Sequence, residues 1–186
     1  MTEPSDRDLM RRLAAGDREA LAPLMERHHR RLYRIALGYL RQPDDALDVV
    51  QETFVKAYTH AARWQSGTDV APWLTRIAVN QAIDVYRRGR RRRRSEEPLE
   101  EAPGRGLAVD DPSPERRVMG REIGERVGSA LAGLPARQRA VFVLRHYEEL
   151  SLEEIARTLG MSLGTVKSAL HRALQRLRQR LEAVRP

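Results

Sequence analysis

The chain has 186 residues, a formal net charge of +8 and no cysteine, so it forms one ordinary domain or two small ones and has no disulfide, thiolate metal site or thiol nucleophile. A sequence pI of about 10.6 is typical of a protein that binds a polyanion, either nucleic acid or an anionic membrane surface. No apolar run approaches the ~18 residues of a membrane span, and the charged N-terminus lacks a signal-peptide core, so we expect a cytoplasmic protein without membrane insertion.

The N-terminal pattern predicts two helices. Ser5 or Asp6 can cap a short first helix, which Gly16 ends. Asp17 can cap the next one, in which Pro23 is expected to cause a kink or a restart. Apolar residues at intervals of three and four predict the buried stripe of this second helix, namely Leu21, Leu24, Met25, His28, Leu32, Ile35, Ala36 and Tyr39.

A third helix is expected after Pro43, with a loop at residues 65–68 and a fourth helix from about Val70. The third helix has the buried stripe Ala46, Val50, Phe54, Ala57 and Ala61. Four of its acids (Asp44, Asp45, Asp48 and Glu52) could form a divalent-metal site or a solvated helix face. No carboxylate-rich partner segment is evident, so we expect no metal site.

The fourth helix carries Arg76, Asn80, Asp84 and Arg87 on one face, because their spacings are four, four and three. Trp73 lies near that face. An aromatic ring beside an arginine and an amide suits an unpaired base, which stacks on the ring while the amide reads an edge. The alternative is that Trp73 is a core residue.

The chain changes character after this helix. Seven of the eight residues from Arg87 to Arg94 are arginine, whereas residues 95–114 hold four prolines, six acids and one base. The arginine block either contacts DNA phosphates or is a solvated charge run. The acidic segment cannot pack a core and is a flexible linker, which spans roughly 65–70 Å when extended. We therefore predict an all-α fold with helical domains at 1–94 and 115–186, joined by the acidic linker at 95–114.

The C-terminal domain has the most specific pattern, that of a helix-turn-helix. One helix is expected up to about Ala132 and another after Pro135. Ser151 and Glu154 have the spacing of a capping box, Gly160 can end that helix, and Ser162 can cap the next one. The last helix has the core stripe Val166, Leu170, Ala173 and Leu177, and its opposite face carries the polar residues Lys167, Ser168, His171, Arg172, Gln175 and Arg178.

The polar face of the last helix has two interpretations. It can read DNA, since its side chains bond to phosphates or base edges, or it can be the solvated face of an ordinary helical pair. Agreement between the caps, the turn length and the core stripe favours DNA binding.

Three segments, DALDVVQETFVKAY, APWLTRIAVNQAIDVYRR and LSLEEIARTLGMSLGTVKSALHRA, together resemble the bacterial sigma-70 family of RNA polymerase sigma factors. The two-domain layout is similar to the extracytoplasmic-function (ECF) branch of that family, and the resemblance extends from about Asp6 to Leu181. It implies a non-enzymatic initiation factor that binds core RNA polymerase (the β′ clamp helices and the β subunit) and promoter DNA, both duplex and melted. An anti-sigma factor is a further implied partner.

The resemblance also implies roles for individual residues. The β′ clamp helices would dock on Asp48, Gln51, Glu52 and Val55. The minus-ten promoter element would be read and melted by Trp73, Arg76, Asn80, Asp84, Arg87 and Arg88, with Asn80 reading a base and Trp73 wedging at the duplex edge. The minus-thirty-five element would be read by Thr165, Lys167, Ser168, His171, Arg172 and Gln175.

The chain departs from the family pattern at two places. Val70-Ala71-Pro72 stands where the family often has a phenylalanine, which bears on the base preference of the preceding loop. Ala169 stands where the family often has an arginine, so that contact to the distal element is missing or has moved to His171 or Arg172.

Two other classes of function remain open from the sequence. An autonomous helix-turn-helix regulator would bind duplex DNA alone, at paired half-sites. A nucleic-acid enzyme would need a nucleophile beside a base, or a carboxylate–metal cluster, and the five histidines show no ligand spacing with the acids. We therefore expect no catalytic residue, metal or cofactor. The target promoters and the inducing signal are not specified by the sequence.

Overall fold

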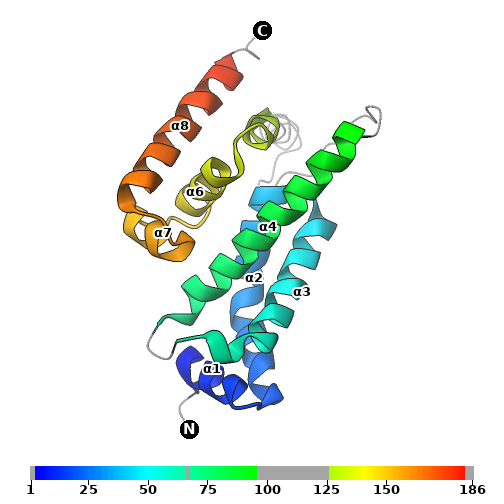
Figure 1. Cartoon of the computed structure of the whole chain (residues 1–186), viewed down its shortest axis with the longest axis vertical. Helices are drawn as coiled ribbons and strands as arrows, with labels where there is room; N and C mark the ends of the chain where they lie inside the picture. The colour runs from blue at the N-terminus through cyan, green and yellow to red at the C-terminus, as the bar shows by residue number, and fades with distance from the viewer. Residues whose placement is uncertain (1–2, 66–67, 96–125, 183–186) are drawn as a thin grey trace, which may run out of the picture.

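The structure, a computed structural model, describes residues 3–65, 68–95 and 126–182, and these form helices joined by short connections (Figure 1). The predicted all-α fold is confirmed. The predicted linker after Ser95 and the first part of the C-terminal domain, up to residue 125, lie outside the described residues. The first half contains α1 (Asp6–Ala14), η1 (Arg18–Ala20), α2 (Leu21–Leu40), α3 (Pro43–Thr59), η2 (Ala61–Arg63) and α4 (Val70–Ser95). The second half contains helical residues 126–132, α6 (Ala136–His146), α7 (Leu152–Leu159) and α8 (Leu163–Glu182).

The N-terminal helices begin and end as their local chemistry predicts. Ser5 forms a capping box with Asp8 at the start of α1, and Gly16 follows that helix with a φ of +96°. The restart expected near Pro23 is the 3-10 turn Arg18–Ala20, after which α2 begins at Leu21. Pro23 therefore lies in the first turn of α2, where its missing N–H removes no helical hydrogen bond.

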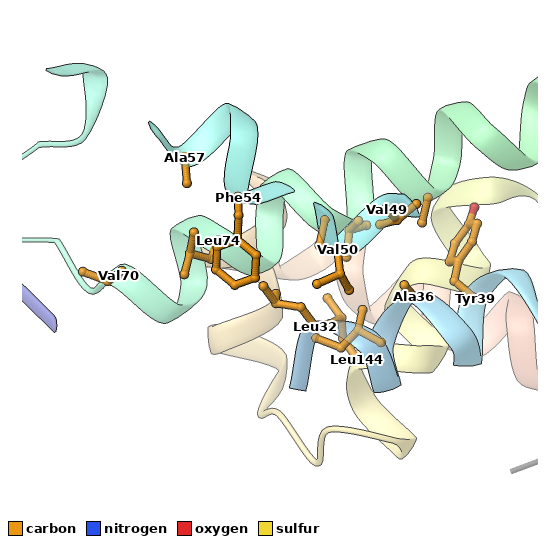
Figure 2. Packing of buried hydrophobic residues seen from close by; sticks show 14 of the residues in the cluster. Leu32, Ala36, Tyr39, Val49, Val50, Phe54, Ala57, Val70, Leu74 and Leu144 are labelled. Atoms are coloured by element: carbon orange, nitrogen blue, oxygen red, sulfur yellow. The ribbon is translucent and has the colours of Figure 1, made fainter. Parts of the chain in front are cut away.

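Helices α2, α3 and α4 pack side by side around the core of the first half (Figure 1). Figure 2 shows how the side chains of the three helices meet: Leu32, Ala36 and Tyr39 from α2, Val49, Val50 and Phe54 from α3, and Val70 and Leu74 from α4. The residues of the predicted third-helix stripe are buried, but α3 ends at Thr59, so Ala61 belongs to η2 and not to α3. The placement of Met25 in the α2 stripe is wrong, since its side chain is 40% exposed. It follows Leu24, and successive residues on a helix point about 100° apart.

The helix-turn-helix folds as predicted. Ser151 and Glu154 form the capping box of α7, and Gly160 ends that helix in the left-handed region with a φ of +62°. The hydrogen bond from the Ser151 backbone holds the pKa of Glu154 below its usual value. Ser162 accepts a hydrogen bond from the Thr165 backbone at 3.2 Å and so caps α8. Two short sequence patterns thus set the boundaries of both helices.

The two halves of the chain share one hydrophobic core. The cluster that contains the α2–α4 core also includes residues of α6, α7 and α8, such as Leu144, Ile155 and Val166. Leu144 of α6 belongs to the same buried cluster as Leu32 of α2 (Figure 2). A smaller cluster of Leu131, Leu134, Ala173 and Leu177, with Ala130, holds α8 against helical residues 126–132. The described residues therefore form one packed body.

Candidate nucleic-acid and polymerase interfaces

The outer face of α4 has the exposed polar residues that a DNA interface requires. Arg76, Asn80, Asp84, Arg87 and Arg88 are all exposed, while Leu74 and Ala78 of the same helix are buried. The division follows from the helical period, because positions three and four residues apart share a face. The predicted minus-ten residues therefore form one solvent-facing row, and their contact with DNA remains a prediction.

The side chain of Trp73 is compatible with both of its interpretations, as a core residue and as a base-stacking residue. Its side chain is half-buried and packs against the edge of the shared core. One side of the indole is thus anchored while part of it stays accessible near Arg76. A ring held in this way loses little freedom when it stacks on a base.

Val70, Ala71 and Pro72 form the first turn of α4. Val70 is 2% exposed and belongs to the core (Figure 2), whereas Ala71 and Pro72 are half-buried in the first turn of α4. The Thr68 hydroxyl donates a hydrogen bond to the Gln65 carbonyl at 2.9 Å. Residues 66 and 67 of the predicted base-binding loop lie outside the described residues.

The arginine block continues the exposed helix. The backbone of α4 remains helical to Ser95, which agrees with the prediction that the block extends the DNA-facing helix. The predicted phosphate contacts of the side chains from Arg90 to Arg94 lie outside the described side chains.

The proposed polymerase-docking face lies on α3. Asp48, Gln51, Glu52 and Val55 are all exposed, and Glu52 pairs loosely with Lys56 at 3.7 Å. Leu47, which the sequence analysis did not include, is 50% exposed beside them. Its spacing of four from Gln51 could have revealed it, because Leu47, Gln51 and Val55 share a face. The face thus joins two apolar side chains to two carboxylates, a composition suited to a protein partner.

The second candidate nucleic-acid surface is the outer face of α8. Thr165, Lys167, Ser168, His171, Arg172 and Gln175 are all exposed. The Thr165 hydroxyl already forms a hydrogen bond with the hydroxyl of the capping residue Ser162, at 2.7 Å. The six predicted minus-thirty-five residues therefore reach solvent together, near the N-terminal part of the helix.

Ala169 lies on the inner face of α8. Its side chain is 7% exposed and belongs to the shared core with Val166. The position three residues after Val166 lies on the inner face of α8, which explains why a small residue occupies it. In this fold Ala169 is a packing residue, and the expectation that a DNA contact is missing or has moved to His171 or Arg172 stays a prediction.

An apolar groove lies at the C-terminal end of α8, and the sequence analysis did not predict it. It has a volume of about 570 Å³ and lies between α6, α8 and helical residues 126–132. Leu174 and Leu181 are its exposed apolar residues, at 42% and 38%. Its walls come from segments far apart in the sequence, so no local pattern signals it.

The acids of α3 do not converge on a metal site. Across residues 3–65, 68–95 and 126–182, no group of three histidines, aspartates or glutamates is placed to hold a metal ion. No helix in the same part of the chain is long and apolar enough to cross a bilayer.

Comparison with known proteins identifies both halves of the chain. Residues 24–93 match the model for sigma-70 region 2, and residues 124–177 match the model for sigma-70 region 4. The chain is 39% identical to the ECF RNA polymerase sigma factor SigE of Mycolicibacterium smegmatis, over 90% of this chain and 65% of that protein. It is 31% identical to the RNA polymerase sigma-H factor of Pseudomonas aeruginosa, over 98% of this chain and 96% of that protein.

Solved structures agree with this match. CnrH, solved in complex with the cytosolic domain of CnrY, has a TM-score of 0.69 and 28% sequence identity to this chain. The match covers 97% of this chain and 99% of the CnrH chain. The sigma factor RpoE of Bartonella quintana, solved with the anti-sigma factor NepR, has a TM-score of 0.60 with 25% identity and covers 88% of this chain and 98% of its own. The chain belongs to the sigma-70 family of RNA polymerase sigma factors, in its ECF branch. The alternative of an autonomous regulator finds no support in these relatives.

Proposed function

We propose that this chain is an alternative sigma factor that binds core RNA polymerase, directs it to a set of promoters and helps to open the DNA. The observation that carries the proposal is the presence of three exposed faces on one body, on α3, α4 and α8, in a chain that matches both region 2 and region 4. Each face has a composition suited to a different partner.

The face on α3 is the one that we assign to the β′ clamp helices of the polymerase. Leu47 and Val55 supply apolar area, and Asp48 and Glu52 supply negative charge. The chain as a whole has a net charge of +8, so this acidic face would select a protein partner over DNA. Charge complementarity of this kind determines the partner and the rate of encounter.

The faces on α4 and α8 are assigned to promoter DNA. Asn80 and the half-buried Trp73 suit a melted base near the minus-ten element. The α8 face suits the major groove of the minus-thirty-five element, where lysine, arginine and glutamine read base edges. The chain contributes no reacting group of its own in this scheme, so it is an initiation factor and not an enzyme.

Two further properties follow from the same proposal. The protein works in the cytoplasm, where the polymerase and the promoters are. An anti-sigma factor is an expected partner, since RpoE of Bartonella quintana, to which this chain is similar, was solved in complex with one.

The decisive experiment is polymerase binding by the double variant Asp48→Lys, Glu52→Lys. We expect the wild-type chain to co-elute with bacterial core RNA polymerase in sizing chromatography at moderate salt. The variant should lose this complex while its circular dichroism stays unchanged, because both side chains are exposed.

The control is a second double variant, Glu26→Lys, Glu153→Lys, which changes the net charge equally at exposed acids outside α3. It should still bind. Equal binding by both variants would refute the docking assignment, and the absence of any complex with the wild-type chain would refute the proposed function.

A further inference from the structure

Helix α1 lies outside both segments that match the sigma-70 models, which cover residues 24–93 and 124–177. It lies at the end of the molecule where α4 begins (Figure 1), and it packs against η2 and α4. Its side chains Leu9 and Met10 are both 0% exposed and join the core cluster that includes Val70 of α4. Helix α1 is therefore part of the packing around the first turn of α4.

The start of α1 is held on α2. The Asp6 carboxylate accepts a hydrogen bond from Arg27 at 2.9 Å, and its second oxygen lies 2.7 Å from Nε2 of His28. Arg27 also donates a hydrogen bond to the Pro4 carbonyl at 2.8 Å. Because His28 is buried, this anchor is partly shielded from solvent. The backbone that leads into α1 consequently has a fixed position relative to α2.

Arg7 connects the same end of α1 to α4. Its Nη2 atom donates a hydrogen bond to Oδ1 of Asp69 at 2.8 Å, across 62 residues of sequence. Asp69 directly precedes Val70, the first residue of α4. Successive side chains on a helix point about 100° apart, so Asp6 and Arg7 can bind two different helices. The start of α1 thus bridges α2 and the N-terminal end of α4.

The local sequence does not favour an arginine at position 7. Arg7 lies in the first turn of α1 between Asp6 and Asp8, where the helix dipole stabilises acids and disfavours cations. The pair with Asp69 is also exposed, at 53% and 68% for the two side chains, and exposed pairs change a folding equilibrium by about fivefold at most. We therefore expect Arg7 to contribute little to the stability of the fold and to act on the position of Asp69.

The first turn of α4 determines how the predicted DNA-reading side chains are placed. Trp73 follows Asp69 by four residues, about one helical turn, and its half-buried ring packs against the edge of the core. Asn80 lies about two turns further along, on the exposed side. Contacts to a base require side chains held within about 0.5 Å of the productive geometry. A larger shift of the first turn would misplace Trp73 relative to the base that Asn80 reads.

We propose that Arg7 is a positioning residue for minus-ten recognition. By binding Asp69 it fixes the first turn of α4, and thereby the placement of Trp73 and Asn80 against unpaired bases. The inference rests on the proposed function, because it takes α4 as the helix that reads the melted element. It adds a role for α1, which lies outside the region 2 match.

The alternative role for an exposed arginine beside α4 is to neutralise a DNA phosphate. The two roles differ in what they predict for Asp69. If Arg7 bound a phosphate, removal of the acid would free the cation and tighten DNA binding. If Arg7 positions α4, loss of either partner has the same effect, and loss of both partners adds nothing further.

Three variants and two controls separate these roles. Arg7→Gln and Asp69→Asn each remove one charge, and asparagine keeps the shape of aspartate and its ability to cap a helix. The third variant combines both changes. Arg7→Lys is the conservative control, because it keeps the cation. Arg11→Gln is the matched control, because the exposed Arg11 pairs with Asp8 inside α1.

The first measurement is acrylamide quenching of tryptophan fluorescence in the free chain. Both tryptophans of the chain, Trp64 and Trp73, flank Asp69 in the sequence, so their emission reports the segment that Arg7 holds. Quenching should rise about equally in Arg7→Gln, Asp69→Asn and the double variant, with little change in the urea midpoint, and should stay unchanged in the two controls. Unchanged quenching in the three variants would overturn the proposal, whatever the outcome of polymerase binding.

The second measurement uses core RNA polymerase with each chain to capture a pool of bubble duplexes in which eight unpaired positions carry random sequence. The sequences that the parent chain enriches should be enriched about threefold less by each of the three variants, within the range of one exposed pair. Arg7→Lys and Arg11→Gln should enrich them as the parent chain does. The amount of polymerase complex should not change, since the α3 face is untouched.

Two results of the capture experiment would refute the positioning role and leave the sigma assignment intact. One is tighter capture by Asp69→Asn, which would show that Arg7 binds a phosphate. The other is equal enrichment by the parent chain and all variants. A parent chain that captures no DNA with the polymerase would refute the proposed function itself, and the inference with it.

Discussion

Single residues set the geometry of the helix-turn-helix. Gly160 turns the chain between α7 and α8 with a φ of +62°, while Ser151 and Ser162 satisfy the free backbone N–H groups at the two helix starts. Each of these residues acts within one or two turns of its own position, so each effect on stability can be measured alone.

We expect Gly160→Ala to reduce the free energy of unfolding by about 1–2 kcal/mol, the cost of a left-handed conformation for a residue with a Cβ. Urea unfolding followed by circular dichroism measures the change. Gly164→Ala is the matched control, since a Cβ at this residue of α8 meets open space. It should leave stability unchanged or slightly raised, and equal losses in the two variants would contradict the assignment to backbone strain.

Helix α4 combines a buried face that packs into the core with an exposed face that we assign to DNA binding. Leu74, Ala78 and Val79 pack into the core, and this packing holds the opposite row of polar residues rigid for recognition. Helix α3 is built in the same way, with Phe54 inside and Glu52 outside. Amphipathic helices allow one element to serve both stability and binding.

Asn80→Ala should reduce promoter opening about tenfold or more, as expected for the loss of one good base contact, and should leave polymerase binding unchanged. Permanganate reactivity of unpaired thymines in the polymerase–promoter complex measures opening. The neighbouring amide Gln81, half-buried on a different side of α4, provides the control variant Gln81→Ala. Equal defects in both variants, or loss of polymerase binding in Asn80→Ala, would count against the base-reading assignment.

At the scale of the whole molecule, the shared core couples the two halves. Tyr39 donates a hydrogen bond to the Ala136 carbonyl at 3.1 Å, and Tyr86 donates one to the Ala132 carbonyl. Two glycines accommodate arginine side chains from other elements, with Arg41 on Gly128 in helical residues 126–132 and Arg180 on Gly133 in the turn after them. The C-terminal half thus packs against α2 and α4 through apolar, aromatic and polar contacts.

This coupling predicts a single cooperative unfolding transition. Both tryptophans, Trp64 and Trp73, lie in the N-terminal half, so their fluorescence reports that half while far-ultraviolet circular dichroism reports all the helices. A Cβ at Gly38 of α2 would lie 3.4 Å from Val143 and from Tyr147, so alanine fits between the halves and leucine does not. The two urea midpoints should coincide in the wild-type chain and in Gly38→Ala, and should separate in Gly38→Leu. Separate midpoints in the wild-type chain would show that the halves unfold independently.

The class of fold, most helix boundaries and the three exposed faces could be predicted from the linear order of residues. Caps, proline positions and the three-and-four spacing act between residues within a turn or two, so these features are visible in the linear order. The motifs of regions 2 and 4 are contiguous stretches of sequence, so they indicate the sigma factor family without any knowledge of contacts between distant residues.

The way in which the two halves pack against each other could not be predicted from the linear order of residues. Glu148 accepts hydrogen bonds from Arg31 and Arg34, which precede it in the chain by 117 and 114 residues. Nothing in the local sequence distinguishes Arg139 from an exposed helical arginine, yet it is buried against the rings of Tyr39 and Tyr86. The inward position of Ala169 and the groove beside Leu174 likewise depend on which segments pack together. Such contacts depend on how segments far apart in the sequence pack together, and the local spacing of apolar residues does not predict this packing.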